Sequence, residues 1–152
     1  MEILAAVAYG LIGSAVMSAL LYLAAQASGG VRSGIRGIGS AIPAPPGGSL
    51  VPGASVHFAA GAVLAGLYAL LGATWGPLSP GGLLALGLGV GLLRALAVSL
   101  VLALLAMGEE PLAFIREAGL AVGGVHVTGS LVYGLCVSAL YGYTTIQPAL
   151  MF

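Results

Sequence analysis

The sequence predicts an all-α membrane protein: a four-helix transmembrane bundle built from two similar helix pairs, with a short amphipathic or re-entrant helix in the first connector. Of the 152 residues, 60% are hydrophobic and 5% are charged, whereas soluble domains carry about 25% charged residues. Four apolar runs reach the length of roughly 20 residues that a spanning helix needs. These runs take up most of the chain, so we expect a single transmembrane domain over residues 1–152.

The expected spans end at polar or Gly- and Pro-rich segments. The first begins after Glu2 rather than a basic residue and is longer than the apolar core of a signal peptide, so we expect it to be retained. Residues 77–82 contain two Pro and two Gly, which is typical of a tight turn. Trp75, Tyr141 and Tyr143 stand at span ends and are expected to form an aromatic belt. The four spans are expected at residues 3–25, 54–75, 83–107 and 120–144.

The first connector, residues 28–53, is rich in Gly, Pro and Ser. Apolar residues recur in it at three- and four-residue steps from Val31 to Ile42, which favours a short helix in the membrane interface or a re-entrant piece. Prolines between residues 43 and 46 end this pattern. The second connector, residues 108–119, carries a charged and solvated face. Its charged residues are Glu109, Glu110, Arg116 and Glu117.

The basic residues outside the spans predict the orientation. Arg32 and Arg36 lie in the first connector and Arg116 in the second, and four spans place both connectors on one side of the membrane. The opposite side has no Arg or Lys. By the positive-inside rule, we expect a multi-pass protein of the cell (inner or plasma) membrane with its connectors in the cytoplasm and both termini outside.

Small residues recur at steps of four in every span and are the candidate helix-packing positions. Steps of four keep residues on one helix face, and small side chains there let helix backbones approach closely in lipid. We expect these stripes to hold helices together, within the chain or between chains. The candidates are Gly10, Gly61, Gly87, Gly91, Gly134 and Ser138.

The second and fourth spans resemble each other. The segment 57–68 aligns with the segment 130–141, which lies 73 residues further along, and Gly, Leu and Tyr recur at equivalent positions. Both spans cross the membrane in the same direction. A duplicated helix pair, with an axis along the membrane normal, explains this most simply.

Several motifs carry a resemblance to a known group of proteins. They are the run Ile35-Arg36-Gly37-Ile38-Gly39-Ser40, then His57-Phe58 with Gly61 and Tyr68, and then Gly129-Ser130-Leu131-Val132-Tyr133-Gly134 with Tyr141-Gly142. The chain resembles small uncharacterised four-helix bacterial integral membrane proteins. This resemblance implies the four-helix fold and brings no established function. In that group a histidine often stands where this chain has Ser130, so the chain departs from a symmetric two-histidine pattern.

Two histidines are candidate ligands on the connector side. His57 and His126 lie near the starts of the second and fourth spans, each about 5–10 Å inside at helical rise. Ser130 is one turn from His126. One interpretation is a shared site, with two axial ligands to haem b or part of a metal or proton-relay site. The other is two interfacial histidines bonded to carbonyls or to hydroxyls such as that of Thr128. Without a carboxylate nearby, the pair suits a hard metal poorly.

Arg94 is the candidate intramembrane charge. It lies about 16–20 Å from either end of the third span at helical rise, and is expected to lie about 10 Å deeper than the histidines. No expected span contains Asp or Glu. The charge must therefore meet carbonyls, Ser or Tyr hydroxyls, water, a bound anion or an acid of another chain.

The function expected from these features is non-enzymatic. No Ser–His–acid or Cys–His arrangement is visible, and the formal net charge of zero argues against a nucleic-acid partner. The leading hypothesis is a small polytopic membrane protein, embedded in the lipid bilayer, that forms a homo-oligomer or serves as an accessory subunit of another membrane protein, with a polar site on the cytoplasmic side. The alternatives are a bis-histidine b-type haem electron-transfer protein and a small-anion pore or carrier that uses Arg94.

Overall fold

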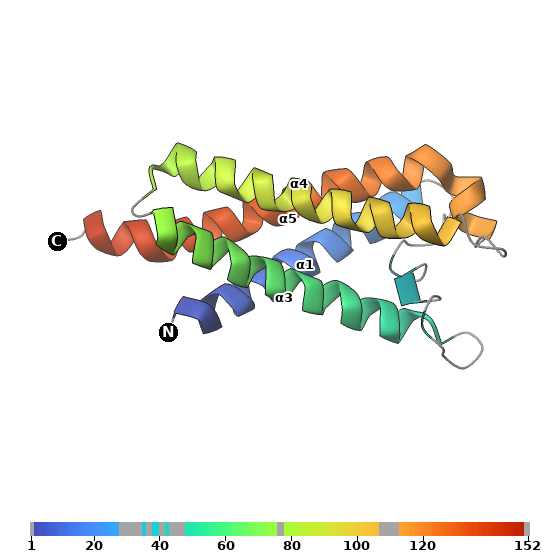
Figure 1. Ribbon diagram of the computed structural model, residues 1–152, viewed down its shortest axis with the longest axis horizontal. Coiled ribbons are helices and arrows are strands. Elements are labelled where there is room, and N and C mark those ends of the chain that lie inside the picture. Colours follow the sequence, from blue (N-terminus) through green and yellow to red (C-terminus); the bar gives the residue numbers. More distant parts are fainter. Residues whose placement is uncertain are drawn as a thin grey trace.

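A computed structural model describes residues 2–27, 35, 38–39, 42, 48–75, 78–106 and 113–150. All regular secondary structure in this part of the chain is helical, and the helices pack as a bundle (Figure 1). Each helix contains a segment long and apolar enough to cross a membrane. The predicted all-α bundle of four helices, each apolar enough to span a membrane, is therefore confirmed. The helices are α1 (Glu2–Ala27), α3 (Leu50–Trp75), α4 (Pro80–Ala106) and α5 (Ala113–Leu150).

Each helix extends beyond its expected span at one end or both, and α3 and α5 do so most. α3 begins at Leu50, and Pro52 lies in its first turn, where the missing N–H of proline costs no helical hydrogen bond. α5 begins at Ala113, seven residues before the expected span. Apolarity marks only the part of a helix that lies in lipid, so helical sequence continues beyond it.

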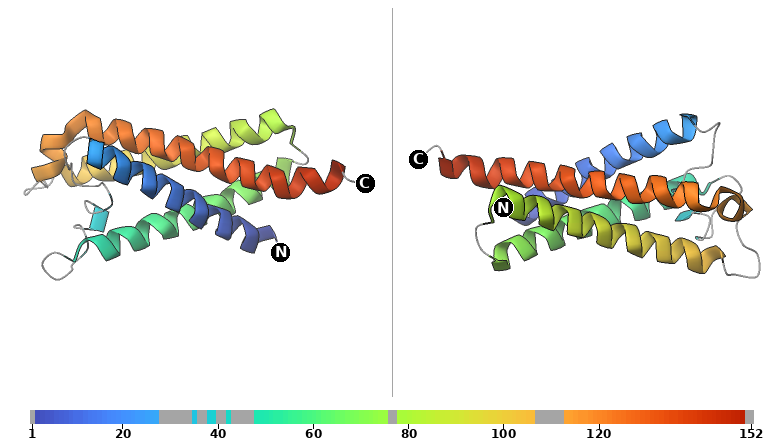
Figure 2. Two further views of the ribbon diagram at one scale, coloured as in Figure 1. Left: turned by 180° about the vertical axis from the view of Figure 1, so that it is seen from behind. Right: turned by 90° about the horizontal axis from the view of Figure 1, so that it is seen from above.

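The two ends of the bundle are distinct. Both termini lie at one end, together with the end of α3 and the start of α4 (Figure 1). We call this the terminal end. The end of α1, the start of α3, the end of α4 and the start of α5 lie together at the other end, which we call the connector end (Figure 2). In the first connector the expected short helix, with Arg32 and Arg36, falls mostly outside the described residues, as do Glu109 and Glu110 of the second.

Close backbone contacts join the helices in two pairs. α1 meets α3 at Gly10 and Gly61: a Cβ on Gly10 would lie 2.8 Å from the Cβ of Ala65 and collide with the carbonyl oxygen of Gly61. α4 meets α5 in the same way, because a Cβ on Gly87 would lie 2.6 Å from both the Gly134 carbonyl oxygen and the Ser138 Cβ. Glycine is required at these crossings, since any side chain would push the helices apart.

The remaining neighbouring helix pairs differ in how closely they pack. α1 also packs on α5, where Gly13 receives the ring of Tyr133 and Gly129 receives Met17. Of the neighbouring pairs, α3 and α4 pack against each other least, and they diverge toward the connector end (Figure 1). Near the turn, the hydroxyl of Tyr68 donates to the Leu83 carbonyl at 3.2 Å. The bundle is therefore closed on the α1–α5 side and looser between α3 and α4.

The residues of the expected aromatic belt differ in their burial. Trp75 is exposed, as expected of a side chain at the membrane surface. Tyr141 instead is buried and its ring meets that of Tyr68 edge-on, with centroids 5.4 Å apart. It follows Tyr133 and Val137 at steps of four and shares their core-facing side of α5. The side chain of Tyr143 lies outside the described residues.

Candidate functional site

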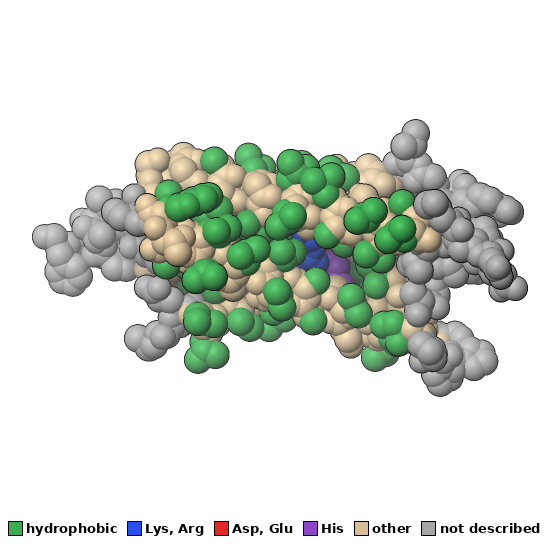
Figure 3. All heavy atoms as spheres, in the orientation of Figure 1, with side chains coloured by type: hydrophobic (Ala, Val, Ile, Leu, Met, Phe, Trp, Pro, Cys, Tyr) green, Lys and Arg blue, Asp and Glu red, His purple; other side chains and the backbone are tan. Residues whose placement is uncertain are grey.

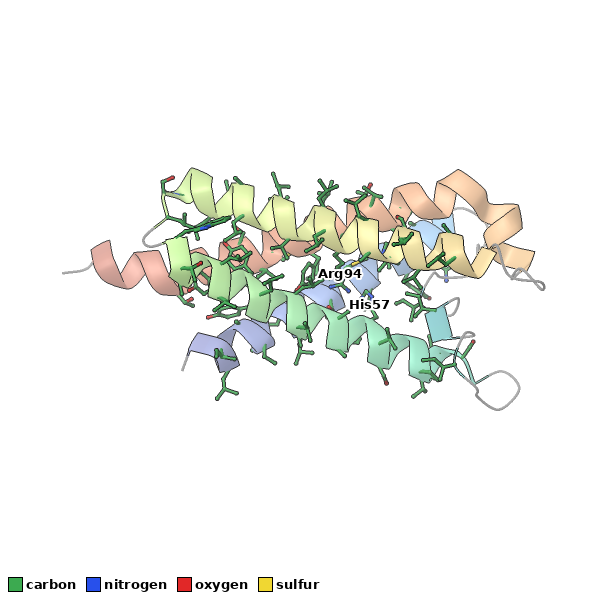
Figure 4. All side chains as sticks on the ribbon, in the orientation of Figure 1. His57 and Arg94 are labelled. Atoms are coloured by element: carbon green, nitrogen blue, oxygen red, sulfur yellow. The ribbon has the colours of Figure 1, made fainter. Side chains whose placement is uncertain are left out.

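Polar side chains from all four helices meet in the middle of the bundle. Arg94 and His57, from α4 and α3, point toward each other there (Figure 4). Arg94 is 2% exposed, and His57 and His126 are each 3% exposed. We call this set the polar core. Its members are Ser14, Ser18, His57, Arg94, His126, Ser130 and Tyr133.

The guanidinium of Arg94 is held by three other helices. Its Nη1 donates to Ser14 Oγ of α1 at 3.3 Å. Its Nη2 donates to the carbonyl oxygen and to Nδ1 of His57, both at 3.1 Å. Its Cζ stands 4.2 Å from the centroid of the Tyr133 ring of α5, a cation–π contact. All these partners are neutral, so they solvate the positive charge without neutralising it.

Hydrogen bonding fixes the state of His57. Arginine can only donate, so Nδ1 of His57 must accept, and the ring is neutral with its hydrogen on Nε2. That Nε2 lies 3.2 Å from the Ser14 carbonyl and 3.1 Å from Ser18 Oγ. Ser18 Oγ itself donates to the Ser14 carbonyl at 2.8 Å and can accept from the ring. Both ring nitrogens of His57 are thus in use.

Gly61 and Tyr133 shape the space around the guanidinium. A Cβ on Gly61 would lie 3.1 Å from Arg94 Nη1 and collide with Ser14 Oγ, so glycine is needed there. Tyr133 places its ring against the guanidinium while its hydroxyl donates to the Gly61 carbonyl. Sequence reasoning did not identify Tyr133 as part of the site. The available signal was a tyrosine in the middle of an apolar span, where its hydroxyl needs a partner.

His126 and Ser130 lie in the α4–α5 contact beside Arg94. A Cβ on Gly91 would lie 2.5 Å from the Ser130 carbonyl. α4 and α5 run antiparallel. The residue one turn after Gly91 on α4, Arg94, therefore lies at the level of the residue one turn before Ser130 on α5, His126. His126 is also within electrostatic range of Arg94 and His57. The structure therefore brings the histidines, Ser130 and Arg94 into one site.

Several buried polar atoms of the polar core have no hydrogen-bond partner among the described residues. They include Nε of Arg94, both ring nitrogens of His126, and Oγ of Ser130. Thr128, considered as a histidine partner, instead donates to the Gly124 carbonyl of its own helix. Arg94 Nε, the protonated nitrogen of His126 and the Ser130 hydroxyl are all donors. The polar core thus presents unused donors next to an uncompensated positive charge.

The geometry corrects one expectation about depth. Arg94 was expected to lie about 10 Å deeper than the histidines at helical rise, yet its Nη2 is 3.1 Å from His57 Nδ1. Backbone rise omits the length of the arginine side chain, and α3 starts at Leu50, which places His57 seven residues inside the helix. Within the described residues, no group of three or more His, Cys, Asp or Glu could hold a metal ion.

No protein-family model, curated protein or solved structure matches the chain. The resemblance to small four-helix bacterial membrane proteins therefore stays a prediction.

Proposed function

We propose that this chain is a non-enzymatic, multi-pass membrane protein that binds an anion at Arg94, inside the bilayer. The observation that carries the proposal is the charge balance of the polar core. Arg94 is the one charged residue whose side chain the structure describes, and its partners are neutral. An arginine at a helix centre costs about 2.5–3.5 kcal/mol on insertion scales. A bound anion would offset that cost and accept from the unused donors.

This proposal displaces the accessory-subunit hypothesis for a specific reason. A self-associating subunit would need its small-residue faces on the outside. The candidate small residues are instead buried against other helices of the same chain. Arg94 is likewise held inside the chain, by α1, α3 and α5. Neither feature is free to form an interface between chains.

The bis-histidine haem alternative has less support than anion binding. Iron takes the lone pair of an imidazole nitrogen. In His57 the lone pair of Nδ1 accepts from Arg94, and Nε2 carries the hydrogen that faces Ser14 and Ser18. Ligation of haem by His57 would require breaking one of these interactions.

We also propose that the bundle arose from a duplicated helix pair, α1–α3 and α4–α5. The contacts of Gly10 with Gly61 and Ala65 have counterparts in the contacts of Gly87 with Gly134 and Ser138. The α5 partners lie 73 residues after their α3 equivalents in both contacts. Tyr68 and Tyr141, also 73 residues apart, touch each other, as equivalent residues beside a two-fold axis would. The anion site would then lie where the two repeats differ, since Ser130 occupies the position in α5 that is equivalent to His57 in α3.

For orientation, we propose that the connector end faces the cytoplasm. Arg32 and Arg36 belong to the first connector and Arg116 to the start of α5, at the connector end, and basic residues next to the spans favour that side. His126 lies nearer the start of α5 than Tyr133 does, so its ring would lie on the cytoplasmic side of the Tyr133 ring.

The test compares the wild type with Arg94→Leu in mild detergent, titrated with sodium chloride, formate or acetate against gluconate at equal ionic strength. An anion at about 100 times its Kd stabilises a protein that binds it by about 2.7 kcal/mol. We expect at least one salt to raise the unfolding temperature of the wild type and not of Arg94→Leu. Leu93→Ala, at a lipid-facing neighbour, is the control and should respond like the wild type. Equal responses in wild type and Arg94→Leu would refute anion binding at this residue.

A further inference from the structure

The polar core can be seen from the lipid-facing side of the bundle. In the space-filling view, arginine and histidine atoms are visible near mid-length between hydrophobic side chains (Figure 3), where the stick view places Arg94 and His57 between α3 and α4. These two helices diverge toward the connector end from the contact of Tyr68 with Leu83. We call the strip between them, on the connector side of that contact, the α3–α4 seam.

The walls of the α3–α4 seam are apolar. On α3, Ala60 and Leu64 precede Tyr68 at steps of four and share the side that faces α4; both are half-buried. On α4, Ala97 follows Arg94 by one turn and is exposed. Nothing polar among these residues separates the guanidinium from the lipid tails. Any anion would have to lose its water to pass here, and an apolar tail lying against these walls would offset part of that cost.

We propose that the ligand is a single-chain lipid carboxylate, a fatty-acid anion, which reaches Arg94 from the bilayer through the α3–α4 seam. This inference rests on the proposed function and names the ligand of that same site. The carboxylate carries one negative charge, which matches the single positive charge of the polar core. Its hydrocarbon tail lies between α3 and α4, against Ala60, Leu64 and Ala97.

The hydrogen-bonding capacity of Arg94 fits a carboxylate. Its guanidinium has five N–H groups, and the bonds to Ser14 and His57 use three of them. The Nε–H is among the groups left over. A carboxylate oxygen accepts from these groups in charge-assisted bonds, which are the strong class of hydrogen bond.

The experiment uses two probes with the same headgroup: oleate and acetate, each labelled with ¹³C at the carboxyl carbon. The full-length protein in lipid nanodiscs is titrated with each, and the carboxyl signal is followed by NMR. We expect a bound oleate signal in the wild type that is absent in Arg94→Leu, and an apparent affinity for acetate that is at least about 100-fold weaker, because acetate lacks the buried chain.

Two variants of α4 distinguish the contribution of the α3–α4 seam, where the lipid tail lies, from that of Arg94, which binds the carboxylate. Ala97→Phe fills the α3–α4 seam beside Arg94, and should weaken oleate binding by about tenfold or more while leaving acetate unchanged. Ala85→Phe is the matched control: it is exposed and lies nine residues from Arg94, on the opposite side of the helix. It should behave like the wild type. The unfolding temperature of both variants is recorded to show that they fold.

The outcomes distinguish the two proposals. If acetate and oleate bind equally well at Arg94 and Ala97→Phe changes neither, a water-borne anion uses the site; the lipid ligand is then excluded and anion binding stands. If neither probe nor any inorganic anion distinguishes the wild type from Arg94→Leu, anion binding itself falls. Binding of a synthetic transmembrane peptide with a central Glu, undisturbed by oleate, would assign the seam to a partner helix and overturn the lipid proposal.

Discussion

Replacing Gly61 by Ala tests whether the polar core depends on the closest helix contact. The added Cβ would collide with Ser14 Oγ and lie 3.0 Å from the Gly10 carbonyl oxygen and 3.1 Å from Arg94 Nη1. Overpacking costs about 1–3 kcal/mol. Loss of the charged hydrogen bond between Arg94 and Ser14 adds about 1.5–3 kcal/mol, and the better helix propensity of Ala returns about 1 kcal/mol. We therefore expect Gly61→Ala to destabilise the protein by about 1.5–5 kcal/mol.

Gly66 provides a matched control on the same helix. A Cβ there would meet nothing within 4 Å, so Gly66→Ala should leave stability unchanged or raise it slightly. The assay is thermal unfolding in mild detergent, followed by the helical circular dichroism signal. Adding Ser14→Ala to Gly61→Ala removes the colliding hydroxyl and should recover part of the lost stability, as a double-mutant cycle would show. If Gly61→Ala is as stable as Gly66→Ala, the close contact between α1 and α3 is not what holds Arg94.

Further substitutions separate the contributions to the polar core. Tyr133→Phe keeps the ring against Arg94 but loses the hydroxyl, so unfolding should become easier by about 1 kcal/mol, whereas Tyr133→Leu should cost more; equal losses would refute a role for the ring. His57→Ala removes a bonded ring and should destabilise more than His126→Ala, whose ring nitrogens have no partner among the described residues; the reverse order in thermal unfolding would contradict this. A reporter fused at Phe152 should be active only outside the cytoplasm, and cytoplasmic activity would overturn the proposed orientation. The purified protein should show no Soret band, since His57 has no free lone pair for iron.

The sequence predicts most of the fold because lipid imposes simple rules. In lipid, a run of about 20 apolar residues satisfies its backbone hydrogen bonds by forming a helix, and each of the four runs is helical in the structure. Stripes of small residues marked the close contacts of Gly10 with Gly61 and of Gly87 with Gly134. The sequence did not indicate which helices would pair, because a stripe of small residues identifies the packing face of one helix but not the helix that packs on it. For that reason α3 and α4, although consecutive in the chain, could not be identified as the loosest of the neighbouring pairs.

The site was predictable in its members but less so in its geometry. Arg94 and the histidines were candidates because ionisable groups in lipid are expensive. Their contact was not expected, because counting residues gives the depth of a backbone atom and not the reach of an arginine side chain. Tyr133 was not predicted to be part of the site, because a tyrosine in an apolar span is typical of a packing residue. Its role became clear only from its contacts with Arg94 and the Gly61 carbonyl.

The aromatic pair at the terminal end has a consequence for transport. Tyr68 and Tyr141 meet across the bundle axis, and Tyr68 is tied to the backbone of α4 at Leu83. Leu83, Leu86 and Val137 are also buried in this half. The bundle is thus closely packed between the polar core and the terminal end. A molecule held at Arg94 would have to leave by the way it came unless the two tyrosines part, so conduction through the protein would be gated by the separation of the two helix pairs.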